Sequence, residues 1–173
     1  FLAYTIFLKK ILILDIIIIS TGFVLRAIGG AILIEVGISA WLIICTIFLA
    51  LFLGFGKRRS ELISLGSKAS GHRTTLKRYS TAHLDLLLGI CASLAIVCYT
   101  MYCLSGHAMQ VIGPDSLLTL PFVIFGIFRY LFMVINDHGG DDPASALFAD
   151  FPLLLTVIIW IVLWVYLIAA RPA

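Results

Sequence analysis

The sequence predicts an all-α transmembrane fold, a helical bundle with five membrane-spanning segments, on three observations. Hydrophobic residues make up 62% of the chain and charged residues 12%, whereas a soluble domain is about half apolar and about a quarter charged. Five windows approach the ~20 mostly apolar residues that a helix needs to cross a bilayer. No run of ~10 residues with alternating hydrophobicity appears, which disfavours a transmembrane barrel.

The five predicted spans follow one another within a single membrane domain, residues 1–173. They cover residues 11–34, 41–56, 84–104, 117–135 and 152–170. The second is the shortest, and the residues that run into Lys57 can extend it. Residues 1–8 read like the tail of an earlier hydrophobic stretch, and no signal-peptide pattern follows Phe1. We therefore interpret the sequence as the C-terminal portion of a longer protein.

The charged residues predict how these spans are oriented. Two long polar loops, residues 57–83 and 136–151, alternate with two short and nearly uncharged ones, residues 35–40 and 105–116. Because the chain crosses the membrane five times, the N-terminus and both long loops lie on the same side of the bilayer. That side holds nine of the twelve Lys and Arg residues, and the other side holds only Arg171. Because positive residues are retained in the cytoplasm, we expect a multi-pass protein of the cell membrane with this face cytoplasmic.

Several functional classes lack the motifs they would need. The sequence has no GxGxxG fingerprint, P-loop, HExxH or GxSxG motif. A nucleic-acid partner is not expected, because the basic loop adjoins the membrane and lacks interleaved aromatic residues. The cysteines have no CxxC spacing and no histidine placed so as to suggest a zinc site, so we expect small apolar residues in the core or facing lipid. They are Cys45, Cys91, Cys98 and Cys103.

Arg26 falls midway through the first span, where a charge is costly unless it faces protein or water. At helical spacing it shares a face with Asp15, Gly22 and Gly30, and the glycines would let another helix approach closely. Two interpretations stay open. One is a buried ion pair with an acidic partner that fixes helix packing, and the other is a cation that lines a polar cavity for an anionic substrate.

A mixed cluster of Lys57, Arg58, Arg59 and Glu61 follows the second span. Three consecutive cations are most often a topology anchor or a contact for anionic lipid head groups. Glu61 lies four residues after Lys57, so the two could pair on a helix. The same residue types also suit a phosphorylated ligand with a metal, because cations hold phosphate oxygens and a carboxylate can bind Mg²⁺.

The remaining polar residues lie in the two long loops. The first loop continues with His72, Arg73, Arg78 and Tyr79 and is long enough either to be functional or to be a solvated basic loop. The second holds aspartates that topology does not require, and these could pair with the basic loop or bind a divalent cation. They are Asp137, Asp141, Asp142 and Asp150. Gly-Gly and Asp-Pro pairs within the second loop predict a turn rather than a continuous helix.

Five sequence blocks, which together span nearly the whole chain, carry a family resemblance. They are DIIIISTGFVLRAIGG (15–30), LALFLGFGKRRSEL (49–62), HRTTLKRYS (72–80), FRYLFMVINDHGGDDP (128–143) and ADFPLLLT (149–156). In order and spacing the chain resembles the UbiA superfamily of intramembrane prenyltransferases, and most closely its decaprenyl-phosphate phosphoribosyltransferase branch. GFVLRAIGG and GKRRSEL are the specific signals for that branch.

This resemblance implies a nine-helix bundle around a central cavity that opens to the cytoplasm. The chain would supply the last five helices and the end of the fourth. The first four would carry the NDxxDxxxD motif that binds Mg²⁺ and a diphosphate in the family. Asn136–Asp137 only echoes it, because Gly140 stands where the next Asp is needed. We therefore expect the isolated segment to be inactive.

The resemblance also implies the reaction of the whole enzyme. It would transfer the 5-phosphoribosyl group of phosphoribosyl pyrophosphate to a decaprenyl or other polyprenyl phosphate, for cell-wall arabinan synthesis, with Mg²⁺ as cofactor. GKRRSEL stands where other UbiA enzymes have a second Asp-rich motif, and added cations suit a more anionic donor. The lipid phosphate is an ionised nucleophile, so catalysis would rest on positioning and on stabilising the departing pyrophosphate.

Roles for individual residues follow from the same resemblance. The expected substrate-binding residues are Lys9 at the cavity mouth, Lys57, Arg58 and Arg73 on phosphate oxygens, Tyr79 and Tyr130 in the pocket wall, and Arg26 as a cavity cation or packing pair. Glu61 is the expected ligand of a metal or the ribose. The Asp137–Asp142 loop is interpreted as a lid or partner surface.

Two other functions compete with this one. The first is a UbiA-type prenyltransferase that acts on an aromatic acceptor, and GKRRSEL in place of an Asp-rich segment argues against it. The second is a non-catalytic protein that binds or transports anionic lipid. Transport would be favoured by broken helices in matched halves, and the sequence shows no such symmetry. We also expect the protein to contact membrane lipid, and a homo-oligomer is possible from the sequence.

Overall fold

The structure is a computed structural model, and it describes residues 13–33, 37, 39–65, 80–136 and 143–170. Within these ranges the chain forms helices and short connections and contains no strand. Five helices are long and apolar enough to cross a membrane. The predicted all-α transmembrane bundle with five spans is therefore confirmed, and the chain is a multi-pass membrane protein.

The spans agree with the predicted windows, except that the second runs on to Leu65. The long helices are α2 (Leu14–Leu33), α3 (Ala40–Leu65), α4 (Thr81–Cys103), α6 (Leu120–Ile135) and α8 (Phe151–Ala169). Three shorter elements connect them, α5 (Gly106–Val111), the 3₁₀ helix η4 (Pro114–Thr119) and α7 (Pro143–Ala149). The fourth span begins three residues earlier than predicted, because η4 continues into α6.

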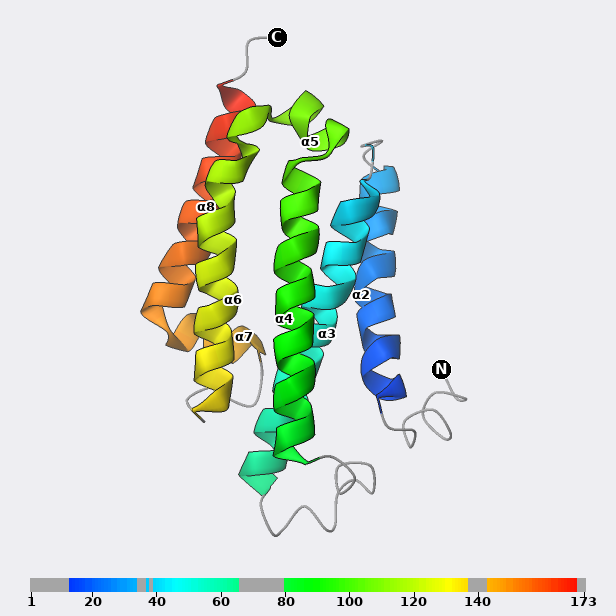
Figure 1. The fold of residues 1–173 in the computed structure, drawn as a ribbon, viewed down its shortest axis with the longest axis vertical. Helices are drawn as coiled ribbons and strands as arrows, with labels where there is room; N and C mark the ends of the chain where they lie inside the picture. The colour runs from blue at the N-terminus through cyan, green and yellow to red at the C-terminus, as the bar shows by residue number, and fades with distance from the viewer. Residues whose placement is uncertain (1–12, 34–36, 38, 66–79, 137–142, 171–173) are drawn as a thin grey trace.

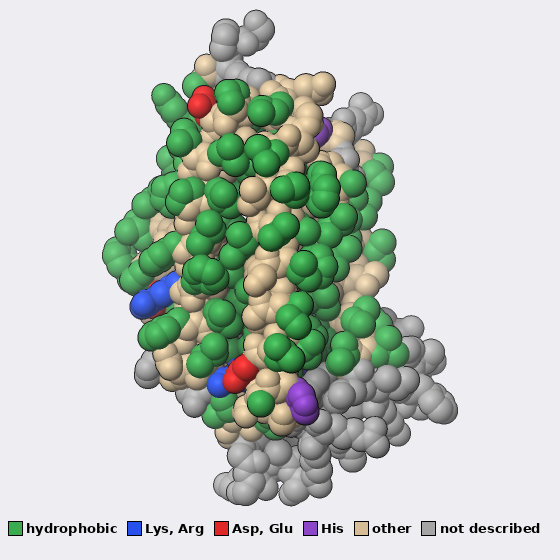
Figure 2. Space-filling model, viewed as in Figure 1, with side chains coloured by type: hydrophobic (Ala, Val, Ile, Leu, Met, Phe, Trp, Pro, Cys, Tyr) green, Lys and Arg blue, Asp and Glu red, His purple; other side chains and the backbone are tan. Residues whose placement is uncertain are grey.

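The five long helices alternate in direction, so their ends gather at two opposite ends of the bundle (Figure 1). One end collects the start of α2, the end of α3, the start of α4, the end of α6 and α7. We call it the polar end. The opposite end collects α5, η4 and the end of α8. Between the two ends, hydrophobic side chains cover the face of the molecule seen in Figure 2, as expected for contact with lipid tails.

Two predictions about the polar end were wrong. Residues 57–65, predicted as the start of a loop, belong to α3, which runs on to Leu65. Lys, Arg, Glu and Leu are good helix formers, and the arginines here have partners on neighbouring helices, so the helix has no reason to stop at the first cation. In the predicted 136–151 loop, residues Pro143–Ala149 form the short helix α7, whereas the turn predicted at the Gly-Gly and Asp-Pro pairs lies largely outside the described residues.

Side-chain caps begin two of the long helices. Ser80 Oγ accepts a hydrogen bond from the backbone N–H of His83 at 3.2 Å and starts α4. Asp150 Oδ1 accepts one from the backbone N–H of Leu153 at 2.9 Å and starts α8. Each cap satisfies one of the backbone donors that the first turn of a helix leaves without a partner.

The interior consists of two clusters of buried side chains. The larger joins α2, α3, α4, α6 and α8 and includes Phe52, Leu84 and Leu88. The smaller lies toward the opposite end and includes Tyr99 and Tyr102. All four cysteines are buried and free, which confirms their predicted role as small apolar residues.

Helix α2 packs on α3 by a close approach at a glycine. Ile16, Ser20 and Val24, spaced four residues apart, are the buried residues along one side of α2. A Cβ added to Gly54 of α3 would lie 2.6 Å from Cγ2 of Ile16. Such a separation is too short for two carbon atoms, so Gly54 is needed for the observed spacing of the two helices.

Gly54→Ala is therefore expected to lower the free energy of unfolding by about 1–3 kcal/mol, the usual effect of overpacking a core. Gly89→Ala in α4 is the matched control, because nothing lies within 4 Å of the added Cβ. That change should stabilise the protein by about 0.5–1 kcal/mol, since alanine is the better helix former. Thermal unfolding in detergent would compare them, and equal effects would contradict the close approach.

Candidate functional site

Two buried arginines of α3 organise the polar end of the bundle. Arg58 and Arg59 are each only 6% exposed. Arg58 donates from Nε to the Asp15 carboxylate of α2 at 3.2 Å and from Nη1 to the Glu61 carboxylate, three residues further along α3. Arg58 thus ties the start of α2 to the end of α3.

Arg59 connects α3 to two more helices. Its Nε donates to Oδ1 of Asp85 on α4 at 2.5 Å, and its Nη1 donates to the backbone carbonyl of Val134 on α6 at 2.6 Å. Charge-assisted hydrogen bonds of this kind are stronger than neutral ones. The two adjacent arginines therefore hold four helices together at one end.

This group of residues, which we call the ionic cluster, is balanced in charge. It consists of Asp15, Arg58, Arg59, Glu61 and Asp85, which form ion pairs, and of Lys57, which precedes Arg58 in the sequence. Together these are three cations and three carboxylates. Glu61 contacts Arg58, and its predicted pairing with Lys57 stays a prediction. An incoming anion would compete with these carboxylates or bring in cations from beyond the cluster. The two buried arginines therefore do not by themselves provide an uncompensated positive charge for an anionic ligand.

An apolar cavity of about 560 Å³ lies between α3, α4, α6 and α8. Its wall is almost wholly hydrophobic and includes Phe52, Val123, Leu153 and Trp160. Tyr130, predicted as a pocket-wall residue, also lines it. The lining of the cavity suits a hydrocarbon chain, because it offers apolar contact and few polar groups.

Tyr130 connects the cavity to the ionic cluster. Its ring packs edge-on against Phe52 at a centroid distance of 5.3 Å, and the residue is 6% exposed. A Cβ added to Gly56 would lie 2.8 Å from the Tyr130 hydroxyl oxygen. Gly56 immediately precedes Lys57, so the tyrosine hydroxyl reaches α3 next to the first cation of the cluster.

The opposite end of the cavity meets a hydrogen-bonded aromatic group that our sequence analysis missed. Tyr99 Oη accepts hydrogen bonds from the indole N–H groups of Trp160 at 3.0 Å and Trp164 at 3.1 Å. It also shares a hydrogen bond of 2.7 Å with the hydroxyl of Thr119. The i,i+4 spacing of the two tryptophans placed them on one helical face, but nothing in the sequence identified Tyr99 as their partner.

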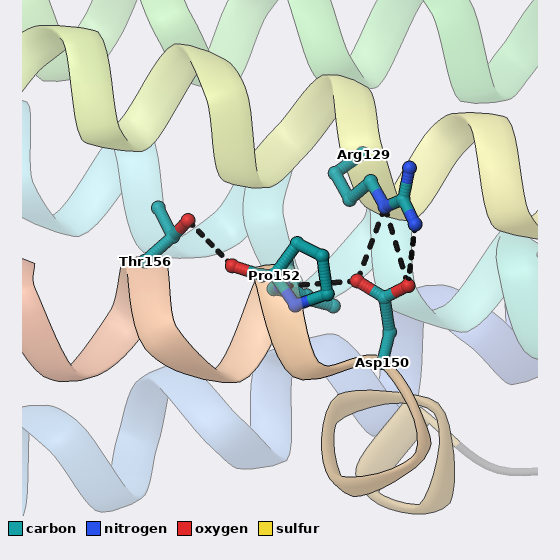
Figure 3. A network of polar contacts seen from close by, with 5 residues as sticks. Arg129, Asp150, Pro152 and Thr156 are labelled. Atoms are coloured by element: carbon teal, nitrogen blue, oxygen red, sulfur yellow. Dashed lines mark hydrogen bonds and ion pairs between the residues drawn. The ribbon is translucent and has the colours of Figure 1, made fainter.

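An ion pair outside the ionic cluster joins α6 to the start of α8 (Figure 3). Arg129 donates from Nε and Nη2 to the Asp150 carboxylate, with the shortest distance 2.7 Å. Hydrogen bonding from Arg129 lowers the pKa of Asp150, and the backbone N–H of Leu153 adds to the effect. Of the four aspartates singled out in the sequence, Asp150 thus has a structural role.

Arg26 lies on the exposed surface of α2, away from the ionic cluster. Its guanidinium stacks on the Phe23 ring at 5.2 Å. Asp15, which shares a helical face with it in the sequence, is bonded to Arg58 instead. The structure therefore does not bring Arg26 together with the other predicted substrate-binding residues that it describes.

The remaining predicted site residues lie outside the described part of the chain. They are Lys9, Arg73 and Tyr79, together with His72, Arg78 and the aspartates Asp137, Asp141 and Asp142. Their assignments remain predictions. Of the predicted set, Arg58 and Glu61 contact each other at the polar end, and the Tyr130 hydroxyl lies close to Gly56, which precedes Lys57.

The described residues do not provide a magnesium site. They contain no group of three or more His, Cys, Asp or Glu side chains that could hold a metal ion. Asp15, Glu61 and Asp85 each contact an arginine, and such a contact competes with metal binding. We therefore derive no step through a metal from this part of the chain, and Glu61 as a metal ligand stays a prediction.

Comparison with known proteins agrees with the motifs. The chain is 30% identical over 168 residues to the decaprenyl-phosphate phosphoribosyltransferase of Mycolicibacterium smegmatis, covering 92% of this chain and 52% of that protein. The chain is thus similar to a protein named decaprenyl-phosphate phosphoribosyltransferase, which supports the resemblance that its motifs indicate.

Two further relatives of that name support the same family. The Corynebacterium glutamicum protein is 28% identical, covering 88% of this chain and 46% of its own length. The Mycobacterium tuberculosis protein is 27% identical, covering 92% of this chain and 52% of its own. The chain thus spans about half the length of the phosphoribosyltransferases it matches. No protein-family model matches it.

The contact between Gly56 and Tyr130 can be tested by a double-mutant cycle. Gly56→Ala should destabilise the protein, because the new Cβ would clash with the tyrosine hydroxyl. Tyr130→Phe removes that oxygen and should lessen the effect of Gly56→Ala, with a coupling of about 0.5–3 kcal/mol. Thermal unfolding of the four proteins measures it. Additive effects would show that the two residues do not touch.

The Asp150 pKa predicts a pH dependence. Because the folded-state pKa is depressed, ionised Asp150 contributes stability above its unfolded value of about 3.9, and this is lost as pH falls through the folded pKa. Asp150→Asn keeps a capping side chain but loses the ion pair. The unfolding temperature of the unmodified protein should exceed that of Asp150→Asn near neutral pH, and this difference in unfolding temperature should disappear below about pH 4. A difference independent of pH would contradict this assignment.

Proposed function

We propose that the chain forms part of a membrane enzyme that transfers the 5-phosphoribosyl group of phosphoribosyl pyrophosphate to a polyprenyl phosphate, such as decaprenyl phosphate. The observation that carries this proposal is the position of the ionic cluster at one end of an apolar cavity, with Tyr130 between them. The names of the related proteins support the same chemistry. The product would serve as a precursor of cell-wall arabinan.

The shape of the site matches the two parts of a polyprenyl phosphate. A prenyl chain is apolar and fits a cavity lined by side chains such as Phe52 and Leu153, and its burial is favoured by the hydrophobic effect. The lipid phosphate would then lie at the polar end. Because Arg58 and Arg59 already contact carboxylates, we expect the predicted cations Lys9 and Arg73 to supply the additional charge.

The proposed reaction is a substitution at the anomeric carbon of the ribose. An oxygen of the lipid phosphate forms the new bond to that carbon, the bond to pyrophosphate breaks, and pyrophosphate leaves with the electron pair. The nucleophile is already ionised, so the protein needs no strong base. Its contribution is to hold two anionic substrates together and to stabilise the charge that builds up on the leaving group.

Three further assignments belong to the proposal. We place the polar end on the cytoplasmic side of the cell membrane, because nine of the twelve Lys and Arg residues belong to the segments on that side. We assign Mg²⁺ as the cofactor of the whole enzyme, and its ligands would have to come largely from outside the described residues. We also propose that the protein contacts membrane lipid and associates with further copies of itself.

The alternative functions predict other substrates. A prenyltransferase for an aromatic acceptor would use a polyprenyl diphosphate and would not need phosphoribosyl pyrophosphate. A lipid-binding or transport protein would bind polyprenyl phosphate without turnover. The described spans Leu14–Leu33 and Ala40–Ser64 are continuous helices, which does not favour transport through broken helices.

The proposal is tested in a protein of the relatives' length, purified in detergent with Mg²⁺. Incubation with labelled phosphoribosyl pyrophosphate and decaprenyl phosphate should give a labelled lipid and release pyrophosphate. Transfer of a prenyl group to an aromatic acid instead would identify the first alternative. Binding of decaprenyl phosphate without turnover would identify the second. The isolated segment 1–173 is expected to give no turnover, and activity there would refute that expectation.

Lys57 provides the sharpest single substitution. Lys57→Ala should raise the KM for phosphoribosyl pyrophosphate roughly 10- to 100-fold, as expected for a lost charge-assisted hydrogen bond, and leave the binding of decaprenyl phosphate nearly unchanged. Lys57→Arg should recover most of the affinity. Asp115→Asn, at the opposite end of the bundle, is the control. An unchanged KM in Lys57→Ala would leave Lys57 as a topology anchor.

A further inference from the structure

Arg26 is a cation in the middle of a membrane span. At 1.5 Å per residue, it lies about 18 Å along α2 from Leu14 and about 10 Å from Leu33. Its side chain is exposed on the surface of the described chain. The contact recorded for it is the ring of Phe23, itself 54% exposed. Among the described residues Arg26 has no ion pair, although a charge at this depth is costly in lipid.

The nearest acidic candidate on the same helix is already engaged. Asp15 bonds to Arg58 of α3, and the two side chains are 8% and 7% exposed. It also lies three turns of helix away from Arg26, farther than an arginine side chain reaches. The compensation that Arg26 needs must therefore come from another element.

The geometry of α2 leaves room for such an element. α2 packs on α3 through the row of Ile16, Ser20 and Val24, and Arg26 does not belong to this row. The Arg26 guanidinium folds back toward Gly22, where an added Cβ would lie 4.0 Å from Nη2. A Cβ at Gly29 or Gly30 would meet nothing within 4 Å. A second helix could therefore approach closely along this side, although the glycines alone would not show that one does.

We propose that the face of α2 around Gly22, Arg26 and Gly30 is an interface for a further transmembrane helix of the same protein, which presents a carboxylate to Arg26. The charge on Arg26 selects an acidic partner, and its depth in the span requires that partner to lie within the membrane. The relatives are about twice the length that this chain spans, which leaves ample sequence for such a helix. This inference does not depend on the proposed enzymatic activity.

The test compares variants in a protein of the relatives' length. Arg26→Leu should lower the thermal unfolding temperature by on the order of 10 °C, because it leaves a carboxylate buried without its partner. Arg26→Lys keeps the charge and should lose much less. Leu25→Ala is the matched control on the adjacent, 63% exposed position, and should change the unfolding temperature little.

A suppressor screen identifies the partner even if Arg26→Leu does not fold well. The screen looks for second substitutions that let the Arg26→Leu protein fold, and a fluorescent protein fused to the C-terminus reports folding. We expect these second substitutions to replace an Asp or Glu in a membrane span outside residues 1–173. Suppressors confined to 1–173 would overturn the proposal in favour of self-association. An unchanged unfolding temperature of Arg26→Leu would also overturn the proposal. In that case the binding of inorganic pyrophosphate is compared between Arg26→Leu and the unmodified protein, and weakened binding would assign Arg26 to a substrate cavity.

Discussion

The arrangement of the helices depends on the compensation of two adjacent arginines buried within a membrane protein. A guanidinium is always charged and is very unfavourable in an apolar interior unless carboxylates or carbonyls surround it. Arg58 and Arg59 of α3 find these groups on α2, α4 and α6 as well as on α3 itself. Four helices must therefore be in place before the charges at this end are satisfied, and α3 becomes the helix around which the others are arranged.

This constraint separates the molecule into a polar end and an apolar interior. The charged groups satisfy one another at the helix ends, so the space between α3, α4, α6 and α8 can remain an apolar cavity. At its opposite end the Tyr99 hydroxyl bonds with Thr119, Trp160 and Trp164, so the polar atoms there are also satisfied internally. A site with one ionic end and one hydrophobic cavity suits a ligand that is itself half phosphate and half hydrocarbon.

Local sequence patterns predicted more of the fold than of the site. Span positions follow from runs of apolar residues, and their alternation follows from simple counting, so the sequence predicted correctly which described segments meet at the polar end. The end of α3 was not, because Lys57, Arg58 and Arg59 were interpreted as the start of a loop. A charge run ends a helix only if its charges cannot be satisfied there, and the satisfaction comes from Asp15, Asp85 and Val134 on other helices.

The sequence by itself determined that this segment contains five membrane spans and resembles phosphoribosyltransferases, since hydrophobic length and short motifs are properties of contiguous residues. Only the tertiary structure decided which charges meet. Asp15 and Arg26 share a helical face in the sequence, yet Asp15 is bonded to Arg58 and Arg26 faces outward. The physical reason is that an ion pair depends on the position of a second helix, and periodicity within one helix carries no information about that position.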